Sequence, residues 1–73
     1  MMDSLKFEIG KVTLHQLNRV KDAMNDIANI NDWQIAPYIN GYLLSVEGIN
    51  IASYSIISSI TALGINAEQL YEE

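Results

Sequence analysis

A capped junction between a strand pattern and a helix pattern limits most strongly how this chain can fold. Residues 5–9 alternate apolar and charged side chains, which indicates a strand with one face on a core. The junction carries Thr13-x-x-Gln16, a capping box that satisfies two backbone amides at a helix start, and Val12 and Leu17 have the spacing of a hydrophobic staple. The helix after it is predicted to bury an apolar stripe made of Leu14, Leu17, Val20, Met24 and Ile27.

A hairpin is predicted in the middle of the chain. Residues 33–39 read as a strand after a turn at residues 29–32, and Pro37, which lacks an amide hydrogen, favours a sheet edge. Asn40-Gly41 is the expected two-residue loop, because a type I′ turn needs positive φ at both positions. The register that follows pairs Ile39 with Tyr42, Pro37 with Leu44, Ile35 with Val46 and, on the other face, Tyr38 with Leu43. Trp33, Ile35, Pro37 and Ile39 would then face the core.

A second helix and a last strand complete the pattern. Asn50 is the expected N-cap, with Ile49 and Tyr54 at staple spacing, and Gly64 suits the left-handed position past the helix end. The predicted buried stripe consists of Ile56, Ile57, Ile60 and Leu63. Residues 48–67 hold no charge, and residues 65–71 would form the short last strand.

The element order strand-helix-strand-strand-helix-strand predicts an α+β, ferredoxin-like sandwich. Right-handed crossovers place both helices on one face of a four-stranded antiparallel sheet with strand order 4-1-3-2. The other face would stay open and carry Lys6, Glu8, Ala36, Tyr38, Leu43 and Ser45. With 73 residues, the chain is expected to be one domain over residues 1–73.

Composition excludes several classes of function. The absence of cysteine removes disulfides, thiolate metal sites and a cysteine nucleophile. A net charge of −5 argues against nucleic-acid binding, which requires clustered cations. No apolar run approaches the roughly 20 residues of a membrane span, and the first six residues lack the apolar segment of a signal peptide. A cytoplasmic protein is therefore expected.

The few cations are unevenly distributed. All four, Lys6, Lys11, Arg19 and Lys21, fall in the first 21 residues, while the rest of the chain is acidic. This predicts a basic patch at one end of the first helix, formed by Lys11, His15 and Arg19, that would bind a protein partner with an acidic surface. The alternative is an ordinary solvated helix face.

Several segments together resemble the heavy-metal-associated domain, a small copper-chaperone-like module. They are Leu5-Lys6-Phe7, the helix end near Ile30-Asn31-Asp32-Trp33, Leu44-Ser45-Val46-Glu47-Gly48 after the hairpin, and Ala62-Leu63-Gly64-Ile65-Asn66-Ala67-Glu68. The resemblance covers about residues 5–70 and implies the same ferredoxin-like fold. The family binds soft metals through Met-x-Cys-x-x-Cys at the first strand-helix turn, because paired thiolates suit copper(I) or zinc. Here Lys11 stands at the methionine position, Thr13 and Gln16 stand at the cysteine positions, and Ile65 replaces the family's usual aromatic residue.

The resemblance without its thiolates predicts a non-catalytic binding module that acts by protein-protein contact in a metal-handling context, with no cofactor. One alternative is a metal-binding or metal-transport domain with a non-thiolate site around His15, with Met1, Met2 or Asp3 nearby. Another is a homodimer that forms a small-ligand regulatory domain through its sheet edges. An enzyme is not expected. Acylphosphatase-like chemistry requires an arginine in the first turn, where this chain has only Lys11. The sequence also contains no Ser-His-Asp pattern, paired carboxylates or glycine-rich phosphate loop.

Overall fold

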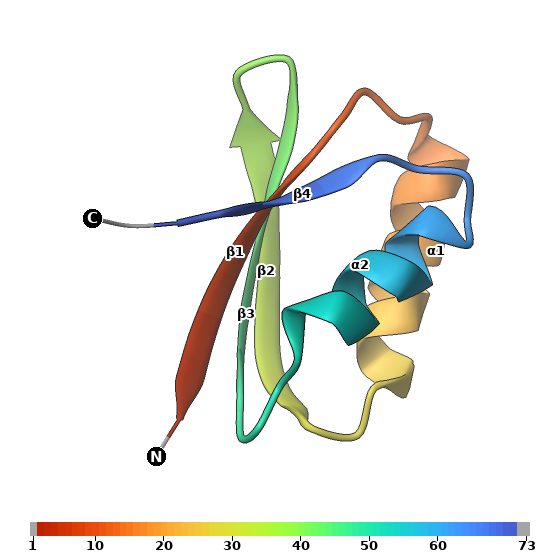
Figure 1. Cartoon of the computed structure of the whole chain (residues 1–73). Helices are drawn as coiled ribbons and strands as arrows, with labels where there is room; N and C mark the ends of the chain where they lie inside the picture. Colours follow the sequence, from red (N-terminus) through yellow and green to blue (C-terminus); the bar gives the residue numbers. More distant parts are fainter. Residues whose placement is uncertain (1, 72–73) are drawn as a thin grey trace.

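A computed structural model describes residues 2–71 and contains one sheet with two helices on the same side (Figure 1). The elements are β1 (Asp3–Ile9), α1 (Leu14–Asp26), β2 (Ile30–Tyr38), β3 (Gly41–Gly48), α2 (Ser53–Thr61) and β4 (Ala67–Leu70). The strands lie in the order β2-β3-β1-β4, and each neighbouring pair is antiparallel. The predicted ferredoxin-like fold and strand order are confirmed.

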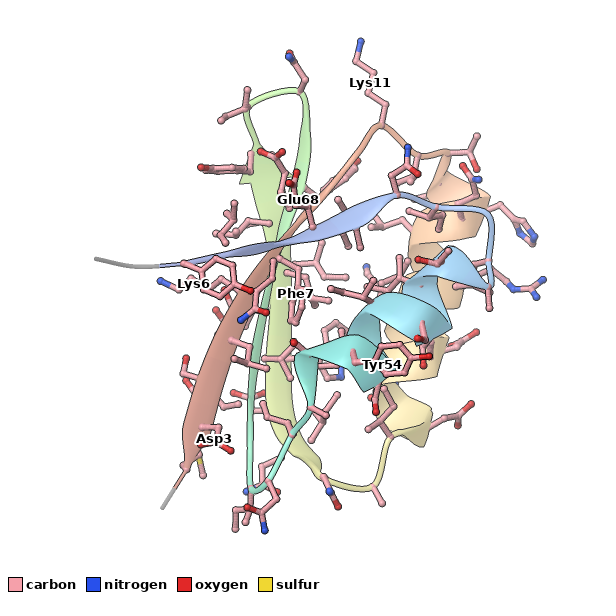
Figure 2. The ribbon with its side chains drawn as sticks, in the orientation of Figure 1. Asp3, Lys6, Phe7, Lys11, Tyr54 and Glu68 are labelled. Carbon is pink, nitrogen blue, oxygen red and sulfur yellow. The ribbon has the colours of Figure 1, made fainter. Side chains whose placement is uncertain are left out.

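The core lies between the sheet and the two helices. Phe7 and Ile9 on the central strand β1 are fully buried, and Phe7 projects toward the helices (Figure 2). Around them pack Val20, Met24, Leu44, Val46, Ile56, Ile60 and Ile65. Burial of one such side chain contributes about 1.5–3 kcal/mol. This single apolar layer is therefore what holds the helices on the sheet.

The hairpin loop differs from the predicted one. Its two residues are Ile39 and Asn40, Tyr38 pairs with Gly41, and Ile35 pairs with Leu44 instead of Val46. Trp33 and Ile35 keep their predicted face because the register is displaced by an even number of residues, and both pack against the core. Pro37, predicted to face the core, is exposed near the end of the edge strand. Gly41 belongs to the strand, since a Cβ there would collide with the carbonyl oxygen of Ile9. Ile39, expected in the core, therefore takes the turn at φ 49° and is 77% exposed.

The first helix begins as predicted, but Leu14 does not join its buried stripe. Leu17, Val20 and Met24 are buried, whereas Leu14 is 74% exposed. The helical advance of about 100° per residue puts Leu14 roughly 90° away from the centre of that stripe. A spacing of three residues between Leu14 and Leu17 therefore does not place Leu14 on the buried face of the helix.

The start of the second helix was also wrongly predicted. The N-cap is Ala52, without a side-chain hydrogen bond, while Asn50 has a left-handed φ of 54°. Asn29 holds the preceding turn: its carbonyl accepts from the Ile49 amide at 3.2 Å, and its side chain donates to the Asn50 carbonyl at 3.4 Å. The expected staple is absent, since Ile49 and Tyr54 are both exposed.

Other parts of the second half follow the prediction more closely. Ile56 and Ile60 are buried, and Ile57 and Leu63 pack partly against the core. Gly64 has the expected left-handed conformation, at φ 80°. β2 begins earlier than predicted, at Ile30, with a bulge before Asp32, and β4 is shorter than the expected strand over residues 65–71.

Candidate functional site

The first strand-helix turn contains the predicted capping box. The Thr13 hydroxyl oxygen accepts from the Gln16 amide at 3.1 Å, and Gln16 Oε1 accepts from the Thr13 amide at 2.9 Å. Leu17 is buried and Val12 packs against the core, as a hydrophobic staple requires. The Thr13 and Gln16 side chains thus both bond to the backbone of the helix start.

Replacing Thr13 with alanine is expected to lower the free energy of unfolding by about 1 kcal/mol, because a side-chain acceptor at the helix N-terminus is lost. Chemical denaturation followed by circular dichroism measures this change. His15→Ala serves as the control, since His15 is exposed on the same turn and takes no part in the capping box. Equal stability of Thr13→Ala and the parent would contradict the structural role of the box.

The three predicted partner-binding residues do not line one common depression. His15 and Arg19, one helical turn apart on α1, line a depression of about 140 Å³ together with Gln16 and Leu63. Lys11 is exposed and lines two other depressions beside the hairpin tip, both of which also include Ile39 and Gly41. Figure 2 shows the Lys11 side chain pointing away from the body of the molecule. The hairpin tip and the start of α1 nevertheless lie at the same end of the molecule (Figure 1).

The same end carries two exposed aliphatic residues that sequence reasoning assigned to the core. Leu14 opens α1, and Ile39 lies in the hairpin loop next to the depression that Lys11 lines. The helical angle of Leu14 was a usable indication of its exposure. The exposure of Ile39 depended on the contact between Gly41 and β1, which no local pattern encodes. Apolar and basic side chains thus occur together at this end.

Asp3, predicted to lie near His15, is far from it. Asp3 begins β1 and lies at the opposite end of the molecule from Lys11 (Figure 2). The length of β1 separates Asp3 from the turn by roughly 20 Å, at about 3.3 Å per residue. Met1 lies outside the described residues. Within residues 2–71, no three His, Cys, Asp or Glu side chains are grouped so that they could hold a metal ion.

Neither helix in the described part of the chain has the length and apolar character needed to cross a membrane.

Comparisons with known proteins give similarity at the level of structure. No family model matches the sequence, and no curated protein matches it. The solved structure of the yeast copper transporter domain Ccc2A, determined in apo and Cu(I)-loaded states, is 17% identical with a TM-score of 0.79, over 96% of this chain and 97% of that one. A copper binding domain from HMA7, a P-type ATPase, is 21% identical with a TM-score of 0.78, over 100% of this chain and 99% of that one.

These similarities confirm the resemblance predicted from the sequence at the level of the fold. The matches extend over almost the full length of both partners, so the whole described arrangement of strands and helices is shared. The chain contains no cysteine. The protein thus has the ferredoxin-like fold of copper-binding domains without a thiolate pair at its first turn.

Proposed function

We propose that this chain is a non-catalytic binding module that acts by protein-protein contact in a metal-handling context in the cytoplasm, as a single domain over residues 1–73. The observation that carries the proposal is the Thr13–Gln16 capping box, with hydrogen bonds of 2.9 and 3.1 Å. Its two side chains stand where the family resemblance puts metal-binding cysteines, and both bond to the backbone instead. The copper-binding descriptions of two structurally similar domains support the metal-handling context.

The proposed contact surface is the end of the molecule at which α1 begins. Lys11, His15 and Arg19 supply exposed basic or titratable groups there, and Leu14 and Ile39 supply exposed aliphatic ones. A partner with an acidic surface around an apolar centre would match this composition. Electrostatic complementarity of this kind accelerates association and weakens as salt is added. The whole chain has a net charge of −5, so this basic end differs in charge from the rest of the protein.

Charge reversal at this end is expected to reduce partner capture by about tenfold or more, because like charges placed across an interface cost several kcal/mol. Affinity capture from a lysate of the source cells, read by mass spectrometry, would compare the parent with Lys11→Glu and Arg19→Glu. Lys21→Glu is the matched control, since it makes the same charge change on α1 outside the proposed surface.

Two outcomes separate a docking surface from a solvated helix face. Loss of the same captured protein with both surface variants, and its retention with Lys21→Glu, would support docking. Equal capture by the parent and all three variants would contradict the proposal. Raising the salt concentration should lower capture by the parent toward the level of the charge-reversed variants.

A further inference from the structure

The edge strand β2 presents a stretch that is well suited to pairing with another strand. β2 is the outer strand of the sheet, and residues 33–38, Trp-Gln-Ile-Ala-Pro-Tyr, carry no charge. Uncharged edge segments rich in aromatic and β-branched residues are common sites of unwanted strand addition. Natural proteins commonly limit pairing at such edges with prolines and bulges, and β2 contains both.

The hairpin register identifies which backbone groups face the open edge. The two-residue loop closes on the pair Tyr38–Gly41, and antiparallel pairs alternate between hydrogen-bonded and non-hydrogen-bonded. The next pair, Pro37–Tyr42, is then of the non-hydrogen-bonded kind. The backbone groups of residues 33, 35 and 37 accordingly point away from β3, toward the position that an added strand would take.

Two of these three positions offer no amide hydrogen to an added strand. The Trp33 amide already donates to Asp32 Oδ1 at 2.9 Å. Pro37 has no amide hydrogen, and its outward orientation explains why the β2–β3 ladder tolerates a proline. Among residues 33–37 of the described chain, the outward amide without such a block is that of Ile35.

Neighbouring features hold this arrangement in place. The Trp33 indole nitrogen donates to Asn25 Oδ1 at 2.9 Å, which ties β2 to α1. The register shift between Ile30 and Asp32 interrupts the regular edge just before the blocked stretch. Bulges at sheet edges commonly hinder strand addition.

We propose that Asp32 and Pro37 close the β2 edge, so that β2 does not pair with β2 of a second copy of this chain. In an antiparallel pairing centred on Ile35, Trp33 of each copy would lie opposite position 37 of the other. The blocked amide of Trp33 and the missing amide of Pro37 would then weaken both ends of the ladder at once. This inference is independent of the proposed docking function, and it opposes a dimeric regulatory domain built on this edge.

Removing both blocks is expected to strengthen self-association by at least about tenfold, because two amides per strand become available. Sedimentation equilibrium would compare the parent with the double variant Asp32→Ala, Pro37→Thr. Glu47→Ala is the matched control: Glu47 is exposed, pairs with Asp32 on the inner strand β3, and makes the same change in charge without altering the edge. The parent and Glu47→Ala should remain monomeric under conditions in which the double variant dimerises.

Amide hydrogen exchange gives a second, independent measurement. Asp32→Ala alone should accelerate exchange of the Trp33 amide by about tenfold and leave the Ile35 amide unchanged. This result would support the proposal even if the double variant failed to fold, and an unchanged Trp33 rate would overturn it. A folded double variant that stays monomeric, or a parent dimer with a protected Ile35 amide, would also overturn it.

Discussion

A variant with cysteine at both position 13 and position 16 is expected to bind copper(I), whereas the parent takes none from a competing chelator. The fold sets these positions at the first strand-helix turn, and paired thiolates are ligands that copper(I) prefers. A helix N-terminus also favours the thiolate form. The cost is the capping box, about 1 kcal/mol, which is small beside the free energy of a copper-thiolate site. Titration against a chromophoric copper(I) chelator under reducing conditions measures the transfer.

A matched variant separates the effect of the turn from that of two added thiols. Ser58→Cys with Thr61→Cys places cysteines at the same three-residue spacing on exposed positions in the second half of α2, away from a helix N-terminus. It should compete for copper at least about tenfold less well than the Thr13→Cys, Gln16→Cys variant. Copper transfer to the parent would contradict the expectation that the parent does not bind copper(I). Equal competition by the two cysteine variants would mean that the turn provides no special geometry.

Phe7→Ala is expected to destabilise the fold by about 3–5 kcal/mol, because it opens a cavity in the centre of the core. Phe7 is fully buried on β1, between β3 and β4. A chain of 73 residues has a total stability of roughly 4–11 kcal/mol. The variant should therefore lose a large share of its stability, visible as a lower denaturation midpoint in urea.

The conservative change Phe7→Leu provides the control for this prediction. It keeps an apolar side chain at the site and should cost clearly less than the change to alanine. If both variants denatured at the midpoint of the parent, Phe7 would not occupy the centre of the core. The Thr13→Ala variant provides a reference for a loss of about 1 kcal/mol.

The candidate site was predictable where a few consecutive residues determine the geometry. Thr13 and Gln16 are three positions apart, and their mutual hydrogen bonds need only the helix start that they create. The exposure of Leu14 and Ile39 was not predicted. Leu14 is exposed because it lies outside the buried stripe of α1. Ile39 is exposed because it lies in the hairpin loop. The prediction that Asp3 lies near His15 is wrong, because the full length of β1 separates them.

The hairpin illustrates how a local preference yields to a distant contact. Asn40-Gly41 is a favourable loop sequence when only the hairpin is considered. In the folded protein Gly41 lies against the Ile9 carbonyl, where any side chain would collide, so the turn moves back to Ile39 and Asn40. Ile39 accepts a left-handed conformation that is rare for a β-branched residue. Packing between β3 and β1 thus outweighs the local turn preference.

The amino-acid sequence by itself determined the order of the elements, the strand order and the capped first turn. The hydrophobic periodicity and the capping residues define each element over a few consecutive residues. The preference for right-handed crossovers then leaves few possible topologies for these elements. Tertiary structure alone decided the hairpin register, the left-handed Asn50 and the exposure of Ile39. Those features depend on contacts between β1 and Gly41 and between Asn29 and residues 49–50, which are far apart in the chain and meet only after the sheet has formed.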